Sequence, residues 1–164
     1  MANEMQAINE VTDREIRMVR ILNAPRELVW KVFTEPEHLA KWWGPTGFST
    51  STKNLDLKPG GRWLLTMRGP DGRDYHNNIV YLEVVKPEYL VFKHTGEDGA
   101  EQASHHTAIT FMEIDGKTKL SFVMTFKSAE ELARIEKEYG AIQGGKETMG
   151  RLVQYLQQLR HRKT

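Results

Sequence analysis

Residues 107–126 read TAITFMEIDGKTKLSFVMTF, and this stretch decides the fold. Asp115-Gly116 at its centre is a strong signal for a tight β-hairpin turn. On both sides of the turn, apolar and polar residues alternate, as they do in strands with one buried face. The stretch therefore predicts two antiparallel strands that share an apolar face. That face carries Thr107, Ile109 and Phe111 on the first strand and Leu120, Phe122, Met124 and Phe126 on the second.

The same period-2 pattern recurs upstream, in segments bounded by Gly and Pro turns. Residues 49–57 are rich in Ser and Thr and indicate a weak edge strand, whereas the other segments are more apolar. Each strand is followed by a breaker, so consecutive strands are expected to form hairpins. The predicted strands are 14–22, 49–57, 62–68, 79–85 and 89–94, in addition to the two arms of the hairpin above.

Helical spacing appears in two parts of the chain. Residues 25–34, and a second short segment from Pro36 to the tryptophan pair, predict two short helices after the first strand. Ser128 followed by Glu131 is a capping box that starts a helix over 130–139. A longer helix is expected from about 142 to 160, after an interruption by Gly140, Gly144 and Gly145, which predicts a helix break followed by close backbone packing. Its apolar stripe is Met149, Leu152, Val153, Leu156 and Leu159.

A sheet with one apolar face and a long helix with one apolar stripe are most simply buried against each other. We therefore expect an α+β fold in which a curved antiparallel sheet wraps around the C-terminal helix. Side chains often fill such an arrangement incompletely, which leaves an apolar cavity. The expected organisation is a flexible leader over 1–13 and a single domain over 14–162.

Composition excludes several classes of function. The chain has 164 residues, 23 Lys and Arg against 22 Asp and Glu, and a net charge of +1, so no basic bias indicates a nucleic-acid or membrane partner. It has no cysteine, which excludes disulfides and thiol chemistry and fits a reducing cytoplasm. No signal peptide or apolar run long enough to span a bilayer is present. We expect a cytoplasmic protein, monomeric or homodimeric.

Trp42 and Trp43 stand side by side before Gly44-Pro45. Adjacent helical positions point about 100° apart, so the two indoles cannot be buried equally against one surface. We expect one ring to be an anchor in the core and the other to line a groove or cavity mouth, with Gly44 as a left-handed cap. The alternative is that both rings are simply core.

Strand parity gives a set of candidate cavity residues, most of them apolar. His94 shares the inward face with Leu90 and Phe92 and could present a polar group to a ligand; the alternative is a core histidine satisfied by one backbone hydrogen bond. Tyr75, Asn77 and Tyr81 share one face by parity, and Arg62 and Arg68 point outward. The candidate ligand residues are Trp43, Trp63, Leu65, Met67, Tyr81, Phe92, His94, Ile109, Phe111, Phe122, Met124 and Met149.

No motif for catalysis or metal binding accompanies this set. His105 and His106 are adjacent in a strand and point to opposite faces, so they cannot both ligate one metal without distortion. The sequence has no Gly-x-Ser-x-Gly motif and no histidine–carboxylate motif with metal spacing. We therefore expect no metal, no cofactor and no catalytic residue.

The order and spacing of three blocks resemble those of a known family. The first holds Ala24-Pro25-Arg26, Val29-Trp30, Pro36-Glu37-His38-Leu39 and Trp42-Trp43-Gly44-Pro45; the second is 56–63, DLKPGGRW, with Met67, Gly69, Asp71 and Gly72; the third is 83–88, EVVKPE, with Leu90, Phe92, Thr118, Leu120 and Phe122. In this the chain resembles the SRPBCC, or START-like, superfamily, and more narrowly the homologues of the activator of the ninety-kilodalton heat-shock chaperone ATPase. The resemblance implies a helix-grip fold over residues 14–160.

One position departs from the family. Gly-Trp usually begins the last helix, whereas this chain has Gly145-Lys146. Because a cation replaces a ring that would pack under the sheet, we expect a larger or more polar cavity at that end, with Lys146 near the Trp63 strand.

The resemblance and the inward residues favour a non-catalytic domain that binds a small hydrophobic molecule. One alternative is an enzyme of the polyketide cyclase or aromatase type, which the superfamily also contains; the scarcity of titratable inward residues argues against it. Another is a chaperone-interacting, stress-response domain. The eukaryotic activators carry an additional N-terminal chaperone-binding domain for which this chain has no room, so co-chaperone activity is not expected.

Overall fold

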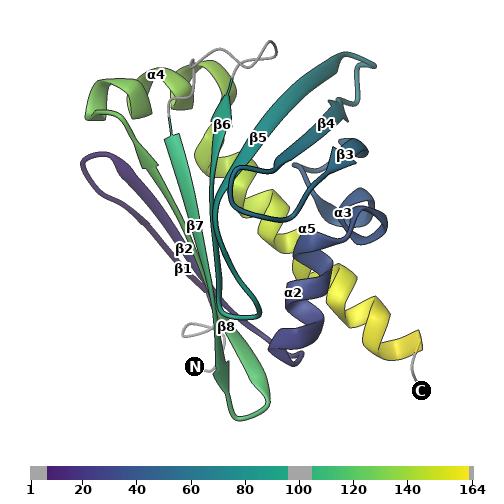
Figure 1. Cartoon of the computed structure of the whole chain (residues 1–164). Helices are drawn as coiled ribbons and strands as arrows, with labels where there is room; N and C mark the ends of the chain where they lie inside the picture. The colour runs from purple at the N-terminus through teal and green to yellow at the C-terminus, as the bar shows by residue number, and fades with distance from the viewer. Residues whose placement is uncertain (1–6, 96–104, 163–164) are drawn as a thin grey trace.

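The computed structural model describes residues 7–95 and 105–162, and these form an eight-stranded antiparallel sheet with four helices. The strand order across the sheet is β1-β2-β8-β7-β6-β5-β4-β3. Figure 1 shows the sheet curving around the long helix α5, so the predicted α+β architecture is confirmed. The strands are β1 Ala7–Val11, β2 Glu15–Leu22, β3 Ser49–Leu55, β4 Arg62–Arg68, β5 Asp74–Val85, β6 Tyr89–Thr95, β7 His105–Ile114 and β8 Lys117–Phe126.

The N-terminal segment corrects the sequence prediction. Residues 7–11 fall within the predicted leader but form β1, an edge strand that pairs with β2 from Ala7 opposite Arg20 to Val11 opposite Ile16. All five residues are exposed, so this strand adds no side chain to the core. A polar segment that lies on the sheet without burying anything has no periodic apolar signal, and sequence reasoning could not detect it. Residues 1–6 of that leader lie outside the described part.

The other strands agree with their predicted alternation. Asp115 and Gly116 both have positive φ in the β7–β8 turn, as a two-residue hairpin turn requires. Ile109 lies opposite Phe122, and both are buried on the same side of the sheet. β3 is an edge strand, as its Ser- and Thr-rich composition indicated, while β5 starts five residues earlier than the predicted 79–85.

Two short helices follow β2: α2 Arg26–Thr34 packs against β7 and β8, and α3 Pro36–Trp42 packs against β3. Pro36 occupies the first turn of α3, where its missing N–H costs nothing. Helix α3 ends at Trp42, and Trp43 is already extended, with φ −67° and ψ 131°. The two indoles therefore separate because the helix stops between them, which corrects the expectation that both are helical. Gly44 follows with φ 105°, a value that favours glycine.

The C-terminal region forms α4 Ala129–Tyr139 and α5 Ala141–Arg162. The Ser128 side chain accepts a hydrogen bond from the Glu131 amide, which confirms the predicted cap. Gly140, with φ 62°, ends α4, as the sequence indicated. Helix α5 then approaches β2 closely: a Cβ added at Gly145 would lie 2.6 Å from the Met18 Cε atom. The predicted close backbone packing is therefore present at Gly145, inside α5.

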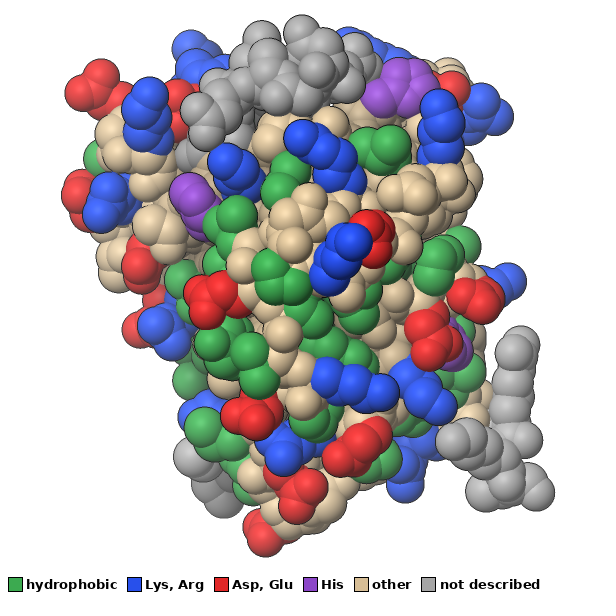
Figure 2. Space-filling model, in the orientation of Figure 1, with side chains coloured by type: hydrophobic (Ala, Val, Ile, Leu, Met, Phe, Trp, Pro, Cys, Tyr) green, Lys and Arg blue, Asp and Glu red, His purple; other side chains and the backbone are tan. Residues whose placement is uncertain are grey.

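The core lies between the inner face of the sheet and helices α2, α3 and α5. We call the end of the sheet beside α4 the upper end and the end at the β7–β8 turn the lower end, as they lie in Figure 1. On the face drawn in Figure 2, basic and acidic side chains are interspersed, in keeping with the net charge of +1. Among the residues that the structure describes, no helix combines the length and the hydropathy that a membrane span requires.

Candidate ligand site on the inner face of the sheet

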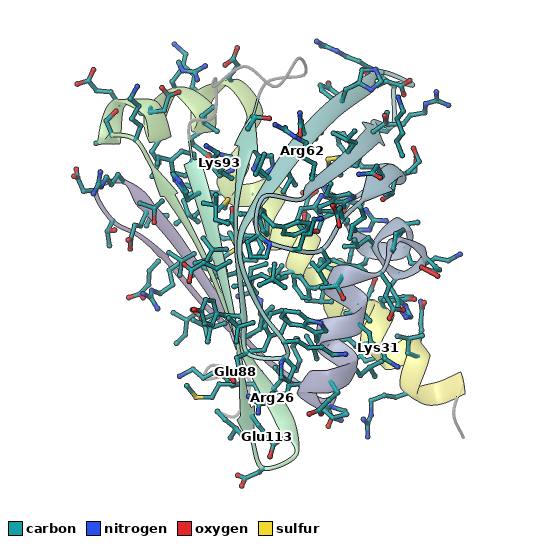
Figure 3. The ribbon with its side chains drawn as sticks, in the orientation of Figure 1. Arg26, Lys31, Arg62, Glu88, Lys93 and Glu113 are labelled. Atoms are coloured by element: carbon teal, nitrogen blue, oxygen red, sulfur yellow. The ribbon has the colours of Figure 1, made fainter. Side chains whose placement is uncertain are left out.

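The inner face divides into two rows with different exposure. The lower row packs against α2 and is almost completely buried: Leu90, Ile109, Phe111 and Leu120 are at most 1% exposed. Two aromatic rings from α2 cover the lower row: Trp30 and Phe33 each make an edge-to-face contact with Phe111. Figure 3 shows charged side chains, among them Arg26, Glu88 and Glu113, at the rim of this lower end.

The upper row keeps part of its surface accessible. Met67 on β4 lies opposite Tyr75 on β5, whereas His94 on β6 lies opposite Ile79. On β7 and β8, His105 lies opposite Phe126 and Met124 lies opposite Thr107. Every member is only partly buried, in contrast to the lower row. The upper row consists of Met67, Tyr75, Asn77, His94, His105 and Met124. A small molecule could contact these side chains without opening the fully packed lower row.

The tryptophan pair borders the upper row with one ring buried and one accessible. Trp42 has 0% exposure, and its Nε1 donates a hydrogen bond of 2.9 Å to the Val32 carbonyl oxygen. Trp43 is partly exposed, and its ring centroid lies 5.0 Å from that of Trp63 on β4. The expected difference in burial between the two rings is confirmed, although their roles in binding remain predictions.

A guanidinium from α5 fixes the loop that carries Trp43. Arg151 Nη1 donates to the carbonyl oxygens of Gly44 and Pro45, both at 3.0 Å, and lies 3.1 Å from the Phe48 carbonyl oxygen. These carbonyls follow the end of α3 and lack partners within that helix, so a cation is a favourable partner for them. Sequence reasoning missed Arg151, because its partners are backbone atoms more than a hundred residues away.

We expect Arg151→Met to lower the free energy of unfolding by about 2 kcal/mol, because several partly buried carbonyl oxygens lose a charged donor at once. Arg134→Met on α4 is the matched control; Arg134 is exposed and pairs with Glu131 and Glu138, so its loss should change stability by less than about 0.5 kcal/mol. Urea unfolding followed by circular dichroism measures both. Equal losses in the two variants would contradict a special role for Arg151.

Two histidines meet in the upper row. The rings of His94 on β6 and His105 on β7 lie 4.6 Å apart between centroids, with an interplanar angle of 32°. Within residues 7–95 and 105–162, neither Nδ1 atom has a hydrogen-bond partner, although both atoms are buried. His106, the next residue along β7, is exposed, so His105 and His106 do point to opposite faces as predicted. The alternative of a satisfied core histidine does not describe Nδ1 of His94.

Burial controls the protonation of this pair. It lowers the pKa of His94 to about 3, with a further contribution from His105. It lowers the pKa of His105 to about 4, with a further contribution from His106. Both imidazoles are therefore neutral at pH 7, and each has one donor and one acceptor nitrogen. Among the described residues, no group of three or more potential ligands could hold a metal ion.

All twelve candidate residues lie in or against the core, but they do not form one site. Trp43, Met67, His94 and Met124 belong to the accessible upper end, whereas Ile109 and Phe111 are packed against α2. Between these extremes, the ring of Tyr81 contacts that of Phe92, which in turn contacts His94. The remaining candidates, Trp63, Leu65, Phe122 and Met149, are at most 8% exposed.

Lys146 does not extend under the sheet. Its side chain is exposed, so it does not make the inner face more polar. Met18 and Met124 instead pack against Gly145, where a Cβ would meet their terminal methyl groups at 2.6 and 3.9 Å. The flexible thioethers fill the space beside the helix. The expectation of a more polar interior at Lys146 is wrong for this reason.

Comparison with known proteins was consistent with this architecture. The family model described as "Activator of Hsp90 ATPase homolog 1-like protein" matches residues 23–157. No curated protein matches the sequence.

Several solved structures share the fold. A Nitrosomonas europaea protein is 24% identical with a TM-score of 0.81, over 93% of this chain and 99% of that one. A Mycobacterium smegmatis protein is 27% identical with a TM-score of 0.79, over 93% and 97% of the two chains. An AHSA1 protein of Silicibacter pomeroyi is 21% identical with a TM-score of 0.68, over 87% and 96%.

Proposed function

The chain belongs to the family of Activator of Hsp90 ATPase homolog 1-like proteins, and from this premise we propose that it is a non-catalytic domain that binds a small hydrophobic molecule on the inner face of its sheet. The observation that carries the proposal is the accessible upper row beside a fully buried lower row. A packed domain without a ligand has no need to leave inward side chains partly exposed at one end.

The chemistry of the upper row supports binding more than catalysis. Its thioether and aromatic groups suit an apolar ligand, and Trp43 and Trp63 add two rings at its border. A catalytic site would need an acid or base placed to exchange a proton near neutral pH. The two histidines have pKa values far below that range, so neither is poised for this exchange.

Titration with the neutral fluorescent probe N-phenyl-1-naphthylamine tests the proposal. We expect wild-type protein to enhance the emission of the probe in a saturable manner and Met124→Gln to weaken binding roughly tenfold, because an inner-face thioether becomes a polar amide that must be desolvated. Met112→Gln is the matched control, since Met112 is 52% exposed on the outer face. Saturable binding that both substitutions weaken equally, or no saturable binding at all, would overturn the proposal.

A further inference from the structure

The His94–His105 pair has features of a recognition site that the packing of the domain does not use. Both side chains point to the inner face, one from each of two neighbouring strands, and their rings lie 4.6 Å apart. Aromatic rings flank them on both sides. The ring centroid of Phe126 lies 5.0 Å from that of His105, and the ring centroid of Phe92 lies 6.1 Å from that of His94. The pair is therefore a polar spot within an apolar, aromatic wall.

The Nδ1 atoms of this pair are left without partners. Each is buried and makes no hydrogen bond to any of the residues that the structure describes. A buried polar atom without a partner costs about 1–3 kcal/mol, and native structures contain few of them. The two side chains nevertheless keep part of their surface accessible, so they lie at the edge of the upper row. A ligand that supplies these partners gains hydrogen bonds that the two imidazoles do not make with the described residues.

The surroundings restrict the chemistry of that ligand. Phe92 and Phe126 favour an aromatic body over a charged one. A carboxylate would have to be buried without a cation, because the two imidazoles are neutral, and burying an unpaired charge is costly. A hydroxyl group, by contrast, both donates and accepts a hydrogen bond, which suits a pair of neutral imidazoles that together offer both functions.

We propose that His94 and His105 form the polar anchor of the ligand site and select a neutral aromatic compound with a hydroxyl group, which hydrogen-bonds the Nδ1 atoms of the pair. This inference rests on the proposed function and specifies the class of ligand. Phe92 and Phe126 are buried beside the pair and keep its surroundings apolar, and His106 on the outer face has no role.

Two nearly isosteric probes, 2-naphthol and 2-methylnaphthalene, separate the hydroxyl from the aromatic body. We expect wild-type protein to bind 2-naphthol about tenfold more tightly than 2-methylnaphthalene, as one satisfied buried hydrogen bond allows. His94→Phe and His105→Phe should each abolish this preference while 2-methylnaphthalene still binds. His106→Phe is the matched control, and the preference should remain in it. Quenching of tryptophan fluorescence measures all of these affinities.

Nitrogen NMR of the wild-type imidazoles gives a second readout that does not depend on the variants folding. Addition of 2-naphthol should shift the Nδ1 resonances of His94 and His105, and 2-methylnaphthalene should leave them nearly unchanged. If wild-type protein binds both probes equally and these resonances do not respond to 2-naphthol, the anchor is wrong while the proposed function stands. If neither probe binds, both the anchor and the proposed function are wrong.

Discussion

Trp42→Ala is expected to lower the free energy of unfolding by about 3–5 kcal/mol. The side chain is fully buried, and its ring lies 4.7 Å from that of Phe33. The substitution leaves a cavity between α2 and α3 and removes the donor to the Val32 carbonyl oxygen. Urea unfolding followed by circular dichroism measures the loss.

Trp43→Ala provides the comparison from the neighbouring position. Its ring is partly exposed, and it contacts Trp42 and Trp63 at centroid distances of 5.4 and 5.0 Å. We expect about half the stability loss of Trp42→Ala, together with a clear change in the affinity for N-phenyl-1-naphthylamine. Equal stability losses for the two variants would mean that both rings are core and that Trp43 is no part of an entrance.

Acidification from pH 7.5 to pH 5 is expected to lower the free energy of unfolding by about 2 kcal/mol for each histidine of the pair. The folded-state pKa values of about 3 for His94 and about 4 for His105 lie below the ordinary value of 6.5. Between these values and pH 6.5, the two imidazoles are therefore protonated in the unfolded chain and neutral in the folded chain. The stability that the two neutral histidines contribute is fully present above pH 6.5. It is lost as the pH falls toward 4 for His105 and toward 3 for His94.

Urea unfolding at the two pH values checks this prediction. The double variant His94→Phe with His105→Phe should lose most of the pH dependence, and His106→Phe should keep it, because His106 is exposed on the opposite face. The groups that act electrostatically on the pair are His105 toward His94 and His106 toward His105. An unchanged pH dependence in the double variant would show that other groups cause the acid sensitivity.

Local patterns predicted the fold well because they report directly on local geometry. The Asp115-Gly116 turn, the Ser128 cap and the alternation through Phe122 each depend on a few neighbouring residues. The same alternation placed the candidate site residues on the inner face. It could not distinguish an accessible Met124 from a buried Ile109, since this difference depends on which helix covers each end of the sheet.

Features that depend on distant partners were not predictable in this way. The sequence placed His94 inward and His105 on a strand face, but their contact requires the register between β6 and β7. Arg151 donates hydrogen bonds to backbone carbonyl oxygens, and no side-chain motif in the sequence predicts such contacts. Lys146 was expected under the sheet because the family usually has a tryptophan at this position. Its charged side chain instead remains exposed to water, where the ammonium group keeps its hydration.

The pairing of β2 with β8 has a consequence for synthesis of the protein in the cell. Glu15 lies opposite Thr125, 110 residues later in the chain. At about 5–20 residues per second, a ribosome delivers β8 roughly 5–20 s after β2. During that interval β1 can protect one edge of β2 through a local hairpin, while the other edge waits without its partner. The nascent chain is therefore most exposed to aggregation at this edge until its last strand emerges.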